Sequence, residues 1–108
     1  MGRTWKEFMA DECGYEVKTT FWDDFTLAER HGGVNAVKET YQRAFKEWHN
    51  NVEYVTELAI VLNHKIWQHY EENYELGKVY NDLWIECDTW CNENLQGDDA
   101  MYYFQTTD

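Results

Sequence analysis

The chain has 108 residues, the size of a single domain, and its 21 acidic and 9 basic side chains give a net charge of −12 at pH 7. Apolar residues make up 44% of the sequence and aromatic residues 18%, a composition that excludes a disordered chain. The negative charge disfavours direct binding of nucleic acid or of an anionic membrane and favours a basic protein partner.

The first quarter of the chain carries mixed signals. Residues 4–10 are typical of a short helix, whereas residues 15–22 alternate and are rich in β-branched and aromatic side chains, which favours an extended segment. A strand there needs a partner, and residues 101–104 are the sole candidate in the sequence. Both alternatives stay open for this part of the chain.

Helical signals are clearer from Thr26, which is expected to cap a short helical turn over residues 27–30. Gly32 and Gly33 are expected to end that turn, and Asn35 to cap a longer helix. The apolar positions of this helix recur at steps of three and four residues, which predicts one inward face. They are Val34, Val37, Tyr41, Ala44, Phe45 and Trp48.

A second long helix is predicted over residues 52–74 and a third over residues 78–95. The second is apolar on more than one side, so we expect it to be central, and Gly77 is expected to end this region. Gly97 ends the third helix, and Asp98 is expected to cap a final turn. The predicted inward positions are Val52, Val55, Leu58, Ala59, Leu62, Ile66 and Tyr70, widened by Ile60, Val61 and Trp67, and in the third helix Tyr80, Leu83, Trp84, Cys87, Cys91 and Leu95.

Together these patterns predict an all-α fold, a small antiparallel bundle of three long helices with short N- and C-terminal elements. We expect residues 1–19 to form an N-terminal extension that includes a short helix, and residues 20–108 to form a single helical domain. The sequence has no apolar run of membrane-spanning length and no signal-peptide pattern at its start, so the expected location is the cytoplasm.

The acidic residues are unevenly distributed. From Ile66 to the end, ten acidic residues accompany a single base, Lys78, and give this segment a net charge of −9. At 100° per residue, three acidic residues of the third helix fall within about 40° of one another, nearly opposite the predicted core positions. The alternative is an ordinary solvated helix face that serves only solubility. The predicted acidic face consists of Asp82, Glu86 and Glu93, together with Glu71, Glu72 and Glu75 before them.

Trp90 is the tryptophan nearest to this acidic face in the third helix, about 60° around the helix from the centre of the three carboxylates. An exposed tryptophan beside carboxylates is typical of a binding hot spot. The alternative is a core or half-buried position, which its proximity to the core edge favours.

Signals for catalysis and metal binding are weak. Cys87 and Cys91 are one helical turn apart and His64 and His69 lie on the preceding helix, a set of residue types that binds zinc elsewhere. Both cysteines fall on the apolar face, where a free thiol behaves as a small hydrophobic group, and the two histidines are poorly spaced for a shared site. The chain has no serine and no metalloprotease or phosphate-loop motif. We therefore expect no enzyme, no bound metal and no cofactor.

Four segments carry a resemblance to known proteins. They are Phe21-Trp-Asp-Asp-Phe-Thr-Leu-Ala, Thr40-Tyr-Gln-Arg-Ala-Phe-Lys-Glu-Trp, Tyr54-Val-Thr-Glu-Leu-Ala-Ile-Val-Leu-Asn-His-Lys-Ile-Trp and the closing Tyr-Phe-Gln-Thr-Thr-Asp. Over about residues 20–108 the chain resembles small, acidic, uncharacterised proteins carried by conjugative elements and phages of Gram-positive gut bacteria. The resemblance implies a mobile-element context, in which small acidic proteins block host defence as anti-CRISPR or anti-restriction proteins. It implies no catalytic residues.

The expected function is that of a non-enzymatic inhibitor from a mobile genetic element. It would bind the basic, nucleic-acid-binding groove of a host defence nuclease, a CRISPR-Cas effector above all, and act as a nucleic-acid mimic. The alternative is a helical adaptor or regulatory module of the element's own replication or transfer machinery. The expected partner contacts are Asp82, Glu86, Glu93, Glu71, Glu72, Glu75 and Trp90.

Overall fold

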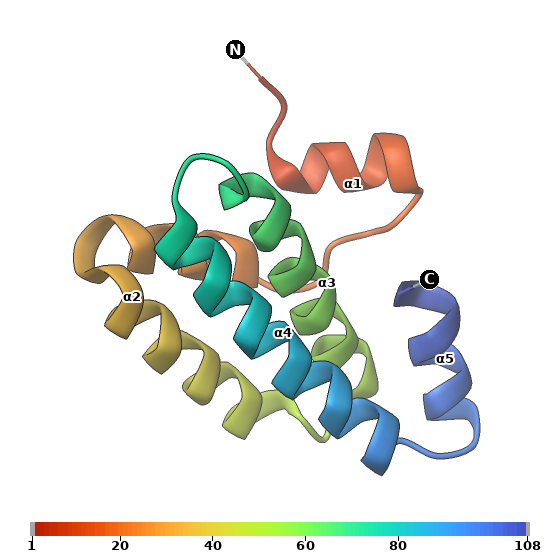
Figure 1. Ribbon diagram of the computed structural model, residues 1–108. Helices are drawn as coiled ribbons and strands as arrows, with labels where there is room; N and C mark the ends of the chain where they lie inside the picture. Colours follow the sequence, from red (N-terminus) through yellow and green to blue (C-terminus); the bar gives the residue numbers. More distant parts are fainter. Residues whose placement is uncertain (1, 108) are drawn as a thin grey trace.

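The protein is a bundle of α-helices (Figure 1). The computed structural model describes residues 2–107, so Met1 and Asp108, which begin and end the two predicted segments, lie outside it. Within the described residues the chain forms five helices and no strand, which confirms the all-α prediction. The helices are α1 (Trp5–Cys13), α2 (Phe21–Trp48), α3 (Val52–His69), α4 (Tyr74–Asn94) and α5 (Asp98–Thr107).

Helix α3 lies at the centre of the bundle, as its apolar sequence predicts. It packs against α2, α4 and α5, and Figure 1 shows α3 and α4 side by side and running in opposite directions. The three long helices are therefore α2, α3 and α4, but α5 is a ten-residue helix rather than a single closing turn.

Helix α2 bends sharply at Gly33, where φ is 65° and ψ is −147°. A glycine adopts such angles without the steric cost that a side chain would add. The predicted break at the glycines is therefore correctly placed, but the helix begins at Phe21 rather than at residue 27. Thr26 and Asn35 were expected to be caps and instead lie within the helix, where the Thr26 hydroxyl donates to the Trp22 carbonyl oxygen at 2.9 Å.

The turn between α3 and α4 comes earlier than predicted. Helix α3 ends at His69, and the Asn73 side chain caps α4 by accepting a hydrogen bond from the Leu76 N–H at 3.2 Å. Gly77 was expected to end this region but lies inside α4, where a Cβ atom would be 3.5 Å from the His69 carbonyl oxygen. The glycine thus lies close against the backbone of α3 and does not interrupt α4.

Neither candidate strand forms. Residues 14–20 are an irregular connection, Phe21 already belongs to α2, and residues 101–104 belong to α5. The short N-terminal helix does form, and Thr4 caps it. The Thr4 hydroxyl accepts a hydrogen bond from the Glu7 N–H at 3.1 Å, and the Glu7 carboxylate accepts one from the Thr4 N–H at 3.0 Å, a capping box.

Helix α1 packs against the bundle through two side chains. The Trp5 ring stacks on Trp22 with 4.9 Å between centroids, and its indole N–H donates to His64 Nδ1 at 3.0 Å. Met9 is buried. These contacts fix the N-terminal segment on α2 and α3.

Most of the predicted inward positions are buried, but the prediction was wrong for two aromatic residues. Trp67 and Tyr70 are exposed, because the chain turns beyond His69 and leaves this end of α3 uncovered on that side. The predicted positions that are buried are Val37, Tyr41, Ala44, Val55, Leu58, Ala59, Ile60, Val61, Leu62, Tyr80, Leu83, Cys87 and Cys91.

None of the helices between residues 2 and 107 is both long and apolar enough to span a bilayer.

Candidate functional site

Four carboxylates line one exposed side of α4. Glu75, Asp82, Glu86 and Glu93 are all exposed, and the helical rotation of 100° per residue places them within an arc of about 40°. At a rise of 1.5 Å per residue they extend over about 27 Å. The opposite side of the helix carries buried residues such as Cys87, so these carboxylates face solvent. We call these four residues the α4 stripe.

The α4 stripe is not neutralised by bases of its own chain. Within residues 2–107 none of its carboxylates forms an ion pair, although Lys78 lies one turn before Asp82. The ion pairs found in that range involve acidic residues of α1, α2 and α3 instead. Like charges one turn apart, as at Asp82 and Glu86, oppose helix formation. The stability of α4 therefore does not explain the stripe.

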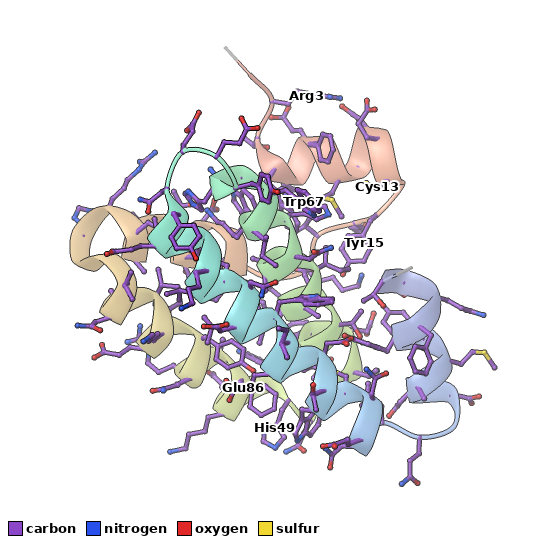
Figure 2. The ribbon with its side chains drawn as sticks, viewed as in Figure 1. Arg3, Cys13, Tyr15, His49, Trp67 and Glu86 are labelled. Carbon is purple, nitrogen blue, oxygen red and sulfur yellow. The ribbon has the colours of Figure 1, made fainter. Side chains whose placement is uncertain are left out.

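The other predicted contacts lie at the borders of the stripe. Glu71 and Glu72 are exposed in the turn before α4. Trp90 is half-buried, and its ring packs edge-on against Phe45 of α2 and His49 just after it, with 5.1 and 5.5 Å between centroids. Figure 2 shows Glu86 on α4 and, near it in this view, His49 at the end of α2. Trp90 thus belongs to the core edge, and a role in partner binding stays a prediction.

Three aromatic side chains are exposed where α3 turns into α4. Trp67 is 66% exposed, Tyr70 65% and Tyr74 79%, and 5.5 Å separates the ring centroids of Trp67 and Tyr70. The apolar periodicity of α3 assigned the first two to the core, so sequence reasoning missed this surface. The signal for it is the run Tyr-Glu-Glu-Asn-Tyr-Glu over residues 70–75, whose carboxylates and asparagine mark an exposed turn.

A buried carboxylate in the middle of α3 was also missed. Glu57 has no exposed surface, and its two oxygens accept four hydrogen bonds from the connection between α1 and α2. The Lys18 N–H and the Tyr15 hydroxyl donate to Oε1 at 2.8 Å each. The Thr19 N–H donates to Oε2 at 2.8 Å, and the Thr19 hydroxyl donates to the same oxygen. Glu57 thus holds this irregular connection against α3.

A second buried polar cluster surrounds Lys65, which also has no exposed surface. Its ammonium group donates to Thr26 Oγ1 at 2.8 Å and lies 3.1 Å from Glu29 Oε2. The Tyr80 hydroxyl donates to that same carboxylate oxygen, and His69 Nε2 approaches it to 3.1 Å without the alignment of a hydrogen bond. Burial lowers the pKa of Lys65, and the nearby Glu29 opposes this shift. The cluster joins α2, α3 and α4.

Three tyrosines donate hydrogen bonds to carboxylates across element boundaries. Tyr15 and Tyr80 donate to the two carboxylates just described, and Tyr103 of α5 donates to Asp88 of α4 at 2.6 Å. Burial raises the pKa of all three hydroxyls, and the hydrogen bond to a carboxylate raises it further.

These tyrosines predict a loss of stability in alkali. An unfolded tyrosine ionises near pH 10, whereas the folded tyrosines keep their protons, so the unfolded state binds fewer protons and stability falls as the pH rises above about 10. The lowered pKa of Lys65 acts in the opposite direction, but it is one group against three. We expect circular dichroism to show helix loss in the same transition in which these three tyrosines ionise, seen as a late rise in tyrosinate absorbance. Complete tyrosine ionisation in a chain that keeps its helicity would contradict this.

The residues considered for zinc lie in separate environments. Burial lowers the pKa of His64, which accepts the Trp5 hydrogen bond, while His69 lies beside Glu29. Cys87 is buried, and the neighbouring Cys91 thiol together with burial raises its pKa, so it remains a protonated thiol. In the part of the chain that the structure describes, no three metal-ligating side chains gather closely enough to hold an ion.

A cleft of about 600 Å³ lies between α1 and α5. Figure 1 shows these two helices on the same side of α3. Its lining includes His64 and Asp88, and the Asp88 carboxylate already accepts hydrogen bonds from Tyr103 and Asn92. The charged and aromatic surfaces around α4 are therefore the stronger candidates for binding a macromolecule.

Comparison with protein-family models, curated proteins and solved structures gave no match for this chain.

Proposed function

We propose that the protein is a non-enzymatic inhibitor that binds a basic, nucleic-acid-binding groove of another protein through the α4 stripe. The observation that supports this proposal is the line of exposed carboxylates that no base of the described chain neutralises. A basic groove built for phosphates attracts such a line, and long-range attraction speeds the encounter of the two proteins.

The α4 stripe has the same sign of charge as a nucleic acid but a lower charge density. Four carboxylates over about 27 Å are sparser than the phosphates of one DNA strand, which follow one another about every 3.4 Å along the axis. The protein would therefore occupy the groove as a competitor rather than reproduce each phosphate position. Glu71 and Glu72 extend the negative region beyond the start of α4.

The proposed target is a host defence nuclease, foremost a CRISPR-Cas effector. The target class comes from the sequence resemblance to small acidic proteins of mobile elements, because the α4 stripe itself specifies only a basic groove. Such nucleases hold their nucleic acid in positively charged channels. A competitor that fills the channel would prevent DNA binding without any chemical step.

Charge reversal provides the test. We expect the triple variant Asp82→Lys, Glu86→Lys and Glu93→Lys to keep its helicity and to lose inhibition at least about tenfold, since several rim charge pairs of up to about 1 kcal/mol each are lost. The measurement is DNA cleavage by a panel of purified guide-loaded Cas effectors and restriction endonucleases, titrated with each protein. A matched control reverses three exposed carboxylates elsewhere, Glu16, Glu39 and Glu47, for the same change in net charge.

Two results of this experiment would contradict the proposal. One is a triple variant of the stripe that inhibits with the same half-maximal concentration as the unmodified protein. The other is an equal loss in the control variant, which would mean that net charge acts without regard to its position.

The second candidate function is a helical adaptor of the mobile element's own replication or transfer machinery. The exposed aromatic group of Trp67, Tyr70 and Tyr74 favours it, because aromatic side chains are enriched in protein interfaces. In an adaptor of this kind the aromatic residues would provide the binding energy, and the carboxylates would provide solubility.

A further inference from the structure

The exposed aromatic group and the acidic turn form one continuous surface at the junction of α3 and α4. Tyr70 and Tyr74 lie on either side of the turn and line a shallow hollow of about 280 Å³ together with Ile66 and Gly77. Trp67 lies beside Tyr70, and its ring is tilted by 37° to that of Tyr70. We call Trp67, Tyr70 and Tyr74 the aromatic end.

Three carboxylates and one base, Lys78, surround the aromatic end, so the net charge there is negative. Glu71 and Glu72 lie in the turn itself and Glu75 follows Tyr74, and none of the three forms an ion pair within residues 2–107. Lys78 also lines the hollow. In the same described range the cations placed over aromatic rings lie at Phe8, Tyr15 and Trp22, and no cation covers the aromatic end.

We infer that the aromatic end binds an arginine side chain of the basic partner, with the guanidinium group stacked on a ring and paired with a carboxylate of the turn. This inference rests on the proposed function for the positive charge of the partner. It adds a specific anchor to the nonspecific attraction of the α4 stripe. The carboxylates of the turn attract the positive charge of an arginine, and the three uncovered rings provide the surface on which its guanidinium group stacks.

Arginine fits this surface better than lysine for two reasons. Its planar guanidinium group stacks on an aromatic face while its edge donates two parallel hydrogen bonds to a carboxylate. Lysine carries a compact, strongly hydrated charge that cannot make both contacts in the same geometry. A surface that only attracts positive charge would not distinguish the two residues.

The experiment titrates the whole protein with two short peptides of equal charge, acetylated and amidated tri-arginine and tri-lysine, and follows backbone and indole N–H resonances by NMR. We expect tri-arginine to shift the Trp67 indole resonance and the amides of residues 66–78, with an apparent Kd about 2–5-fold lower than that of tri-lysine. The variants Trp67→Ala and Tyr74→Ala should each remove this preference. Phe104→Ala is the matched control, because Phe104 is also an exposed aromatic residue but lies on α5.

Equal Kd values for the two peptides, or shifts confined to residues 82–93, would overturn the arginine anchor. Because the substituted side chains are exposed, the unfolding midpoints of the variants should match that of the unmodified protein. This measurement separates lost binding from lost folding. Failure of this test leaves nuclease inhibition through the α4 stripe intact. Conversely, a normal preference for arginine in a protein that inhibits no nuclease would reject the proposed function and keep the anchor.

Discussion

Replacing Glu57 with alanine is expected to destabilise the protein by about 3–5 kcal/mol, a large fraction of the about 5–15 kcal/mol that a domain of this size possesses. The substitution removes the acceptor of four hydrogen bonds, two of them from the backbone of Lys18 and Thr19. It also leaves a cavity beside the middle of α3, because the Glu57 side chain has no exposed surface. Urea unfolding followed by circular dichroism measures the change.

Two further variants show whether hydrogen bonding to the carboxylate is the cause. In Glu57→Gln one oxygen still accepts the Tyr15 and Lys18 donors, but the amide NH₂ faces the Thr19 N–H, so we expect an intermediate cost of about 1–3 kcal/mol. Glu53→Ala alters an exposed carboxylate of the same helix and should cost less than about 1 kcal/mol. A cost for Glu57→Ala no larger than that for Glu53→Ala would contradict this account.

Removing the Lys65 ammonium group is the other substitution with a large expected effect. We expect Lys65→Met to cost about 3 kcal/mol or more, because it retains most of the side-chain volume but leaves the Glu29 carboxylate without its cation in a largely buried position. It also removes the cation that lies 4.1 Å from the centroid of the Trp22 ring. The free energy of unfolding in urea is again the measurement.

A double-mutant cycle separates the pair from its surroundings. If the cost arises from an uncompensated charge, Lys65→Met with Glu29→Gln should be more stable than Lys65→Met alone by about 1 kcal/mol or more. The hydrogen bond from Tyr80 can be kept by the glutamine oxygen, which makes this second substitution mild. Strictly additive costs would show that Lys65 and Glu29 do not act on one another.

The sequence predicted helices well where apolar residues recur at steps of three and four. Residues 34–48 and the buried positions of α4 followed their periods of three and four, and the short helix after Thr4 formed with its capping box. The wrong boundaries came from residues with two possible roles. Gly77 was read as a helix stop, but Asn73 already caps α4, and a glycine inside a helix is tolerated where it lies against a neighbouring backbone.

The buried polar residues were not predictable from local patterns, because their partners are distant in the sequence. Glu57 binds donors 38 to 42 residues earlier, and Lys65 pairs with Thr26, 39 residues earlier. A charged residue in an apolar helix is usually placed at the surface, and only the tertiary structure shows that these two are satisfied inside. The same limit placed Trp67 in the core, since periodicity does not reveal where the covering helices end.

The positions of the acidic residues were predictable, because a regular helix determines which residues share a face. Asp82, Glu86 and Glu93 are exposed on one side of α4, and the earlier start of this helix adds Glu75 to the same line. The identity of a partner is not predictable in the same way, because it depends on a surface that this sequence does not encode.

The salt dependence of binding tests the role of the α4 stripe most directly. Fluorescently labelled protein is titrated with the nuclease that we propose as its target, at low and at physiological salt. The account predicts that the Kd of the unmodified protein rises at least about tenfold between the two conditions, and that the triple charge-reversal variant binds weakly at both. A Kd that is the same at low and physiological salt would contradict it, because an interface without a dominant charge contribution would then account for binding.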